Sequence, residues 1–178
     1  MPEAETVPRR QRRLPQQQRR QQLLAYALTV AARKGLGRTG HAEIAEAAGV
    51  STPTVFAYFP TRRDLLAAVI AEVDRFYTAL GQTYHRTADD AATILRRHLE
   101  AFVLSMDSDP DYAVVWLEWA ALVRNEDGLW DGFLDFQERM IKTVAATIRR
   151  GQREGAVSAE IRPHDSAAEE ILRYAMPA

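Results

Sequence analysis

The 178-residue chain has no cysteine, and this absence excludes several kinds of chemistry. Disulfide bonds, thiolate nucleophiles and cysteine-ligated zinc all need a residue that the chain does not have. The sequence also has no apolar run of about 18 residues, the length that a membrane-spanning helix requires. Its arginine-rich N-terminus is not followed by the apolar segment of a signal peptide, so we expect a cytoplasmic protein.

Motifs of catalysis are missing as well. The four histidines, His41, His85, His98 and His164, lie on separate segments, and none has the HExxH spacing of a zinc hydrolase. The sequence contains no GxSxG nucleophile elbow, no phosphate-binding loop and no pair of carboxylates expected to share a cleft. We therefore expect no catalytic residue, no metal and no cofactor.

The charges that are present are unevenly distributed. Residues 1–63 contain 11 Lys or Arg and 4 Asp or Glu, whereas residues 64–178 contain 12 and 20. A basic N-terminal part suits a polyanion, and an acidic remainder discourages non-specific wrapping of the same polyanion. Scattered solvated charge is the alternative explanation of this split.

The spacing of apolar residues predicts an all-α protein with eight helices. Residues 1–18 contain interior prolines, arginines and a glutamine run, and we interpret them as a disordered basic arm. No segment alternates with period two for long enough to form a strand. The expected helices run from Arg19 to the stop at Gly35, over 41–48, from Ser51 to Pro60, from Thr61 toward Gly81, and over about 89–106, 110–124, 129–154 and 164–175.

The stretch HAEIAEAAGVSTPTVFAYF, residues 41–59, contains two helices that are too short to be stable alone in water. Each becomes stable only by packing its inner face, which is the arrangement of a helix-turn-helix. Ala45 allows close approach, Gly49 can adopt the positive φ of the turn, and Ser51 is expected to cap the second helix. The sequence therefore predicts a helix-turn-helix within residues 19–63.

Small and hydroxyl-bearing side chains occupy the outer face of the second helix: Thr52, Pro53, Thr54, Ala57 and Tyr58. Such a face suits a helix that enters a DNA major groove about 12 Å wide, because small side chains allow depth and hydroxyls reach phosphates or base edges. His41, at the start of the preceding helix, is expected near a phosphate. The alternative is an ordinary pair of helices inside a bundle, which uses the same glycine turn.

These residues carry a resemblance to a known family. The stretch 21–73, including IAEAAGVS and TPTVFAYFPTRRDLL, closely resembles the DNA-binding domain of TetR-type transcriptional regulators. Within that superfamily it is most similar to the LuxR/HapR/SmcR group of quorum-sensing master regulators. VVWLEWAALVRNEDGLWDGF, residues 114–133, resembles the tryptophan-rich ligand-domain segment of the same group. The resemblance implies a helix-turn-helix domain over 19–63 and a helical effector-binding and dimerisation domain over 64–178.

The resemblance also implies which residues contact double-stranded DNA with a roughly palindromic operator. Thr52 and Pro53 would face base edges, and Thr54, Tyr58 and Arg62 would hold phosphates. The arginines of the arm would lie along the flanking minor groove. Ala57 departs from the asparagine usual in this group, which leaves at most a methyl contact there. The full expected DNA-binding set is Arg9, Arg10, Arg12, Arg13, His41, Ser51, Thr52, Pro53, Thr54, Ala57, Tyr58 and Arg62.

Aromatic residues on the later helices have two possible roles. From the sequence alone a plain hydrophobic core is favoured. The resemblance implies an effector pocket instead, lined by Tyr77, Leu80, Trp116, Phe133 and Met140. Such a pocket would be mostly apolar, so its ligand would be a small lipophilic or aromatic molecule.

The resemblance further implies a homodimer formed through the last two helices of each protomer. The sequence shows no ninth helix before Ala178. Either the sequence is truncated, or the dimer forms through the helix at 164–175 with help from the helix at 129–154. We expect a homodimer, less stable than is usual for the family, and no membrane partner.

Two function classes are weighed against each other. The favoured one is a sequence-specific DNA-binding regulator whose DNA affinity is changed by a small ligand. The alternative is a non-specific or architectural nucleic-acid-binding protein, in which the basic arm does most of the binding. The sequence leaves open the operator, the effector, and whether the outcome is repression or activation.

Overall fold

The computed structural model describes residues 15–85, 89–122 and 130–163, and within these ranges the regular elements are all helical. This confirms the expected all-α class. The elements are α1 (Gln16–Lys34), a short 3-10 turn η1 (Leu36–Arg38), α2 (His41–Ala48), α3 (Thr52–Phe56), α4 (Arg62–His85), α5 (Ala91–Ser108), α6 (Pro110–Leu122) and α7 (Trp130–Arg153). The helix expected at 164–175 lies outside the described residues.

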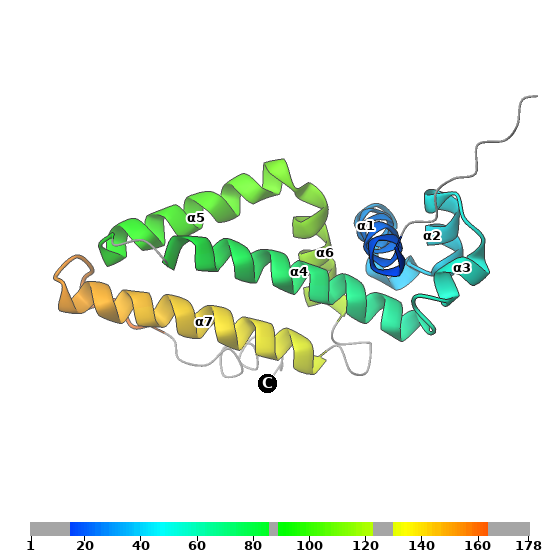
Figure 1. The fold of residues 1–178 in the computed structure, drawn as a ribbon. Coiled ribbons are helices and arrows are strands. Elements are labelled where there is room, and N and C mark those ends of the chain that lie inside the picture. The colour runs from blue at the N-terminus through cyan, green and yellow to red at the C-terminus, as the bar shows by residue number, and fades with distance from the viewer. Residues whose placement is uncertain (1–14, 86–88, 123–129, 164–178) are drawn as a thin grey trace, which may run out of the picture.

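The short helices gather at one end of the molecule. Figure 1 shows α1, α2 and α3 packed together there, with α4 running from them along the length of the molecule. The helix α5 packs against both α4 and α7, and α6 packs against α1, α4 and α5. The larger helical part is therefore joined to the helix-turn-helix through the chain of α4 and through the packing of α6 on α1.

One continuous core joins the two parts. Buried residues of α1, α2 and α3, such as Leu23, Ile44 and Val55, belong to the same cluster as Trp119 and Phe136 of the larger part. The division at residue 63 therefore does not coincide with a gap in the packing, and it stays a prediction. None of the helices in the described part meets the length and hydropathy of a membrane span.

Two helix boundaries differ from the sequence-based prediction. α1 begins at Gln16, three residues before the expected start, with Pro15 at its N-cap. Proline is tolerated at this position because a backbone N–H at a helix start has no partner within the helix. α4 does not stop near Gly81 but continues to His85. Gly81 is buried, and a Cβ there would lie 3.3 Å from the His98 ring of α5. The glycine permits close approach of α5, so it is a packing residue and not a helix terminus.

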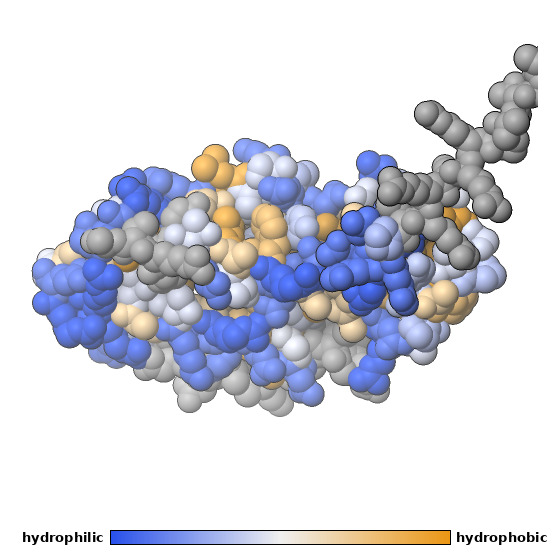
Figure 2. Space-filling view, in the orientation of Figure 1, coloured by the Kyte–Doolittle hydropathy of each residue, from blue (hydrophilic) through white to orange (hydrophobic). Residues whose placement is uncertain are grey.

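Apolar side chains also reach the surface. On α5 the exposed ones are Leu99, Val103, Leu104 and Met106, and on α6 Leu117 is more than half exposed. Apolar patches are visible in the space-filling view among mostly hydrophilic surface (Figure 2). Single exposed apolar residues are normal on a soluble domain, so this face carries no functional argument by itself.

Candidate nucleic-acid interface

The turn between α2 and α3 has the geometry that its sequence requires. Gly49 adopts φ +63° and ψ +37°, the left-handed conformation that favours glycine. The amide of Val50 donates to the carbonyl of Ala45 (3.0 Å), which closes the end of α2. Ala45 is 3% exposed and Val55 is fully buried, so both helices bury their inner faces against the core. The two short helices are thus held rigidly by packing.

The outer face of α3 is open to solvent. Ser51, Pro53 and Ala57 are exposed, and Thr52, Thr54 and Tyr58 are half-buried. Neighbouring helices therefore do not cover this face, as an interior bundle helix would require. The regular helix is short and ends at Phe56, so Ala57 and Tyr58 lie in the turn that follows it. Their individual contacts with DNA stay predictions.

Ser51 does not cap α3 in the expected way. It occupies the N-cap position with extended backbone, but its side chain makes no bond to a backbone amide of α3. Its hydroxyl lies 2.8 Å from the Thr54 hydroxyl instead. The expectation of a side-chain cap is therefore wrong, and the two hydroxyls form a pair at the solvent-facing start of the helix.

His41 is not placed to meet a phosphate, because its side chain is buried at 7% exposure. Its Nε2 lies 2.7 Å from the carbonyl oxygen of Phe59, and its ring stacks on Phe56 with centroids 3.8 Å apart. These contacts tie the start of α2 to the end of α3. The expectation of a DNA contact by His41 is therefore corrected: it positions the helix-turn-helix from inside.

Arg62 also makes contacts within the protein. Its Nε donates to the carbonyl of Thr39 (3.2 Å), and one terminal nitrogen donates to the carbonyls of Leu36 (3.2 Å) and Gly37 (2.9 Å). The guanidinium thereby braces the segment between α1 and α2 against the start of α4. The resemblance implied a phosphate contact only, and the structure adds this internal role.

One further basic side chain, Arg20, lies beside the candidate interface in the described part of the chain. The expected minor-groove residues Arg9, Arg10, Arg12 and Arg13 lie outside the described residues. Arg20 of α1 was not expected at the interface; its side chain is exposed, and its guanidinium lies over the Phe59 ring, 5.0 Å from the centroid. The surplus of basic residues in 1–63 was the only sequence signal that could have indicated it.

The five expected ligand-binding residues all belong to the hydrophobic core cluster or pack against it, and a shared pocket for them stays a prediction. Tyr77 and Trp116 lie together, with ring centroids 6.3 Å apart, and Phe102 packs against both. Phe133 contacts Trp119 instead, at 5.3 Å. Leu80 is partly buried against the core. Met140 lines a separate apolar groove of about 260 Å³ on α7.

The Tyr77 and Trp116 pair holds buried polar atoms. The indole Nε1 of Trp116 is buried without a hydrogen-bond partner. The Tyr77 hydroxyl makes no bond of good geometry, and the nearby Ser105 hydroxyl donates to the Phe102 carbonyl (2.7 Å). Burial raises the pKa of Tyr77 above its usual value, and the proximity of Ser105 partly offsets this effect. Two buried polar groups thus lie at one aromatic cluster, and a role for them in ligand binding stays a prediction.

Comparison with known proteins places this geometry in a family. Residues 23–69, from α1 into α4, match the family model described as bacterial regulatory proteins, tetR family. The chain belongs to the TetR family. The TetR helix-turn-helix is therefore the unit formed by α1, α2 and α3, as the sequence resemblance implied.

Relatives extend the likeness beyond this domain. The HTH-type transcriptional regulator LuxR of Vibrio harveyi is 39% identical over 122 residues, which are 68% of this chain and 58% of LuxR. The HTH-type transcriptional activator FasR of Mycolicibacterium smegmatis is 36% identical over 102 residues, 57% of this chain and 46% of FasR. The chain thus spans only about half the length of these TetR-family relatives. Both are named as regulators, in keeping with the expected lack of enzymatic activity.

A solved structure shows the same fold over more of the chain. It is a protein from Saccharomonospora viridis described as a transcriptional regulator, in complex with choline. The two are 26% identical with a TM-score of 0.73, and the match covers 89% of this chain and 81% of that one. The TetR-like arrangement therefore includes the helices beyond α4.

Proposed function

We propose that this TetR-family chain is a sequence-specific DNA-binding transcriptional regulator that acts as a homodimer. One observation carries the proposal: the outer face of α3 is open to solvent and has small side chains, while its inner face is fixed by Val55 and the buried His41. A helix of this kind can enter a major groove without rearranging the domain. A cytoplasmic location, where DNA is accessible, is part of the proposal.

The proposed contacts follow from position on the interface. Thr52 and Pro53, at the start of α3, read base edges, and the hydroxyls of Thr54 and Tyr58 hold phosphates. Ala57 offers only a methyl group, which suits contact with a thymine methyl. The arm arginines add electrostatic affinity along the backbone.

In a dimer, two α3 helices must lie about 34 Å apart to enter successive major grooves of one duplex face. α4 is the element that sets this distance, since it begins beside α3 and packs against α5 and α6 of the larger part. We propose that the dimer forms through the apolar groove on α7, lined by Met140, Val144 and Ile148 among others, together with the segment 164–175. Monomers alone at tens of micromolar, with DNA affinity intact, would contradict the dimer.

A small-molecule effector is the regulatory part of the proposal. The aromatic cluster of Tyr77, Phe102 and Trp116 supports it, because a buried indole N–H without a partner is costly unless something binds it. The Saccharomonospora viridis neighbour holds a small molecule, which supports ligand binding on this fold. The likeness to LuxR supports, in addition, the role in quorum sensing that the sequence resemblance implied.

A competition experiment tests DNA recognition. A duplex selected from a random pool by the full chain competes against random duplex at moderate salt; a specific regulator prefers the selected duplex by a factor of roughly 10³ or more. Equal competition would contradict the proposal and favour the architectural alternative.

Paired variants separate base reading from phosphate binding. Thr52→Ala should change the sequence preference, whereas Tyr58→Phe should weaken binding to all duplexes about equally. A uniform loss from Thr52→Ala would contradict the base-edge assignment.

A further inference from the structure

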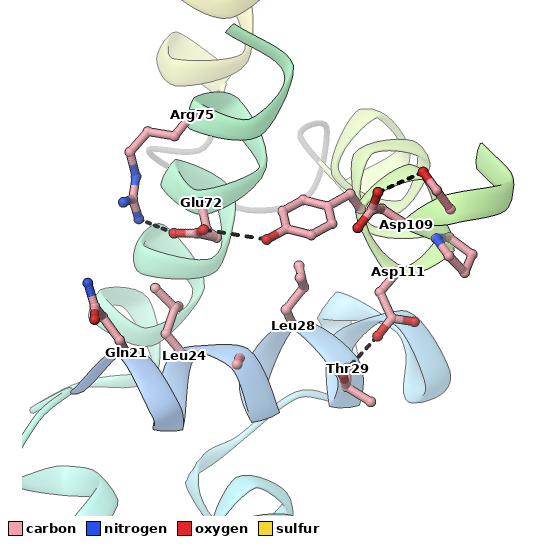
Figure 3. Close-up of a pocket in the computed structure, with 12 residues that line it drawn as sticks. Gln21, Leu24, Leu28, Thr29, Glu72, Arg75, Asp109 and Asp111 are labelled. Carbon is pink, nitrogen blue, oxygen red and sulfur yellow. Dashed lines mark hydrogen bonds and ion pairs between the residues drawn. The ribbon is translucent and has the colours of Figure 1, made fainter. Parts of the chain in front are cut away.

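A cavity lies at the junction between the helix-turn-helix and the larger part. It measures about 540 Å³ and lies between α1, α4 and the turn from α5 into α6 (Figure 3). This volume falls in the range of small-molecule sites.

The walls of this junction cavity differ in chemistry. The α1 wall contains three apolar side chains, the exposed Ala25 and the largely buried Leu24 and Leu28, beside the polar Gln21 and Thr29. The opposite wall carries the carboxylates of Glu72, Asp109 and Asp111 against the single guanidinium of Arg75 in the lining, and this guanidinium is ion-paired with Glu72 (Figure 3). The cavity is therefore amphipathic and has a net negative charge.

Tyr112 lies in the carboxylate wall of the cavity. Its ring stacks on Phe76 with centroids 4.1 Å apart, and its hydroxyl donates to Glu72 Oε1 at 3.4 Å. Burial raises the pKa of Tyr112 most, and the charge of Glu72 and its hydrogen bond raise it further; Asp109 adds to the effect and Arg75 opposes it. Tyr112 is thus held between Phe76 and Glu72, beside the carboxylates of the cavity.

The form of the cavity restricts the ligand class. The N-terminus of α6 would attract an anion, but Asp109 and Asp111 already occupy that end. Among the described residues no cluster of three carboxylate, histidine or cysteine side chains is arranged to hold a metal ion. A cation with an aliphatic body matches both walls, because the charge meets the carboxylates and the body covers the leucines.

We propose that the junction cavity binds a small alkylammonium ion, with its charge at the Glu72 and Asp111 wall and its hydrocarbon part on α1. Asp111 already accepts a hydrogen bond from Thr29 of α1 (2.7 Å), so the same wall joins the two parts of the molecule. A ligand here touches α1, α4 and α6 at once and fixes their relative placement.

Calorimetric titration of the full chain with n-butylammonium chloride at neutral pH, without DNA, tests the binding. We expect saturable binding, with 1-butanol and butyrate at least tenfold weaker. The double variant E72Q/D111N keeps the shape of both side chains and should weaken butylammonium binding at least tenfold. The matched control E100Q/D135N removes the same charge from exposed positions on α5 and α7 outside the cavity and should leave it unchanged.

Ala25→Met keeps the test decisive if the double variant fails to fold. Ala25 is exposed on α1, and a longer side chain there fills the cavity while every carboxylate remains. It should abolish binding. The absence of saturable binding, equal binding of 1-butanol, or unchanged affinity in these variants would overturn the proposal.

The effect of the ligand on DNA rests on the proposed function. Saturating butylammonium should change the affinity for the selected duplex at least fivefold in the native chain and not in Ala25→Met. Failure of sequence-specific DNA binding would overturn the regulator proposal and leave the calorimetric result standing, so the two failures are distinguishable.

Discussion

Replacing Arg62 with alanine distinguishes an internal brace from a phosphate contact. The substitution removes three hydrogen bonds, to the carbonyls of Leu36, Gly37 and Thr39, at 2.9–3.2 Å. Hydrogen bonds from a charged donor contribute about 1.5–3 kcal/mol each in favourable settings. Because Arg62 is half-buried, we use the lower contribution of about 1 kcal/mol each. The free energy of unfolding should fall by about 2–3 kcal/mol.

Thermal unfolding without DNA measures this loss. For a chain of this size 1 kcal/mol corresponds to about 2–4 °C, so Tm should fall by about 5–10 °C. Arg63→Ala removes the same charge from the exposed neighbouring residue and should change Tm by less than about 2 °C. An unchanged Tm for Arg62→Ala would refute the internal bracing role of Arg62. If the slope of log K against log[salt] for DNA binding also fell by about one, the side chain would be a phosphate contact instead.

Three further predictions concern stability. His41→Ala should lower the unfolding free energy by about 2–4 kcal/mol in urea denaturation, since it removes the Phe56 stacking and the bond to Phe59; full stability with weakened DNA binding would return His41 to the DNA surface. Gly151→Ala should destabilise the protein by about 1–3 kcal/mol, because the added Cβ would clash with the Val157 side chain. The control Gly132→Ala makes only an ordinary contact with Trp119 and should be neutral or stabilising by up to about 1 kcal/mol. A lower Tm for Gly132→Ala than for Gly151→Ala would contradict this packing. The raised pKa of Tyr112 means that the folded state favours the neutral phenol, so the stability that Tyr112 contributes is present below about pH 10 and is lost as the pH rises through the folded-state pKa. Tyr112→Phe should therefore show a smaller loss of stability at alkaline pH than the native chain. An equal loss in both proteins would contradict this prediction.

Local patterns in the sequence were sufficient to predict the helices of the described part and the turn between α2 and α3. Apolar spacing predicts the helices of the described part to within a few residues, and Gly49 adopts the left-handed conformation that the short turn requires. Gly81 was misinterpreted as a terminus because its neighbour, the His98 ring, comes from another helix. Periodicity along one segment contains no information about that approach.

Long-range contacts explain what the sequence did not indicate at the candidate interface. His41 meets a carbonyl 18 residues away, and Arg62 reaches carbonyls 23 to 26 residues away. Both side chains are polar and lie beside the recognition helix, so a DNA contact was the simpler interpretation. The junction cavity could not be predicted either, since its walls come from segments about 40 and 80 residues from α1.

The absence of cysteine from the chain allows a direct test of the α3 docking. Ala57→Cys places a single thiol on the exposed interface, where it can carry an iron chelate that cleaves nearby DNA; Ala146→Cys, exposed on α7, is the control. With the selected duplex, the account predicts strong cleavage from position 57 in two patches about 34 Å apart and none from position 146. The same weak pattern from both positions would contradict the claim that α3 enters the major groove.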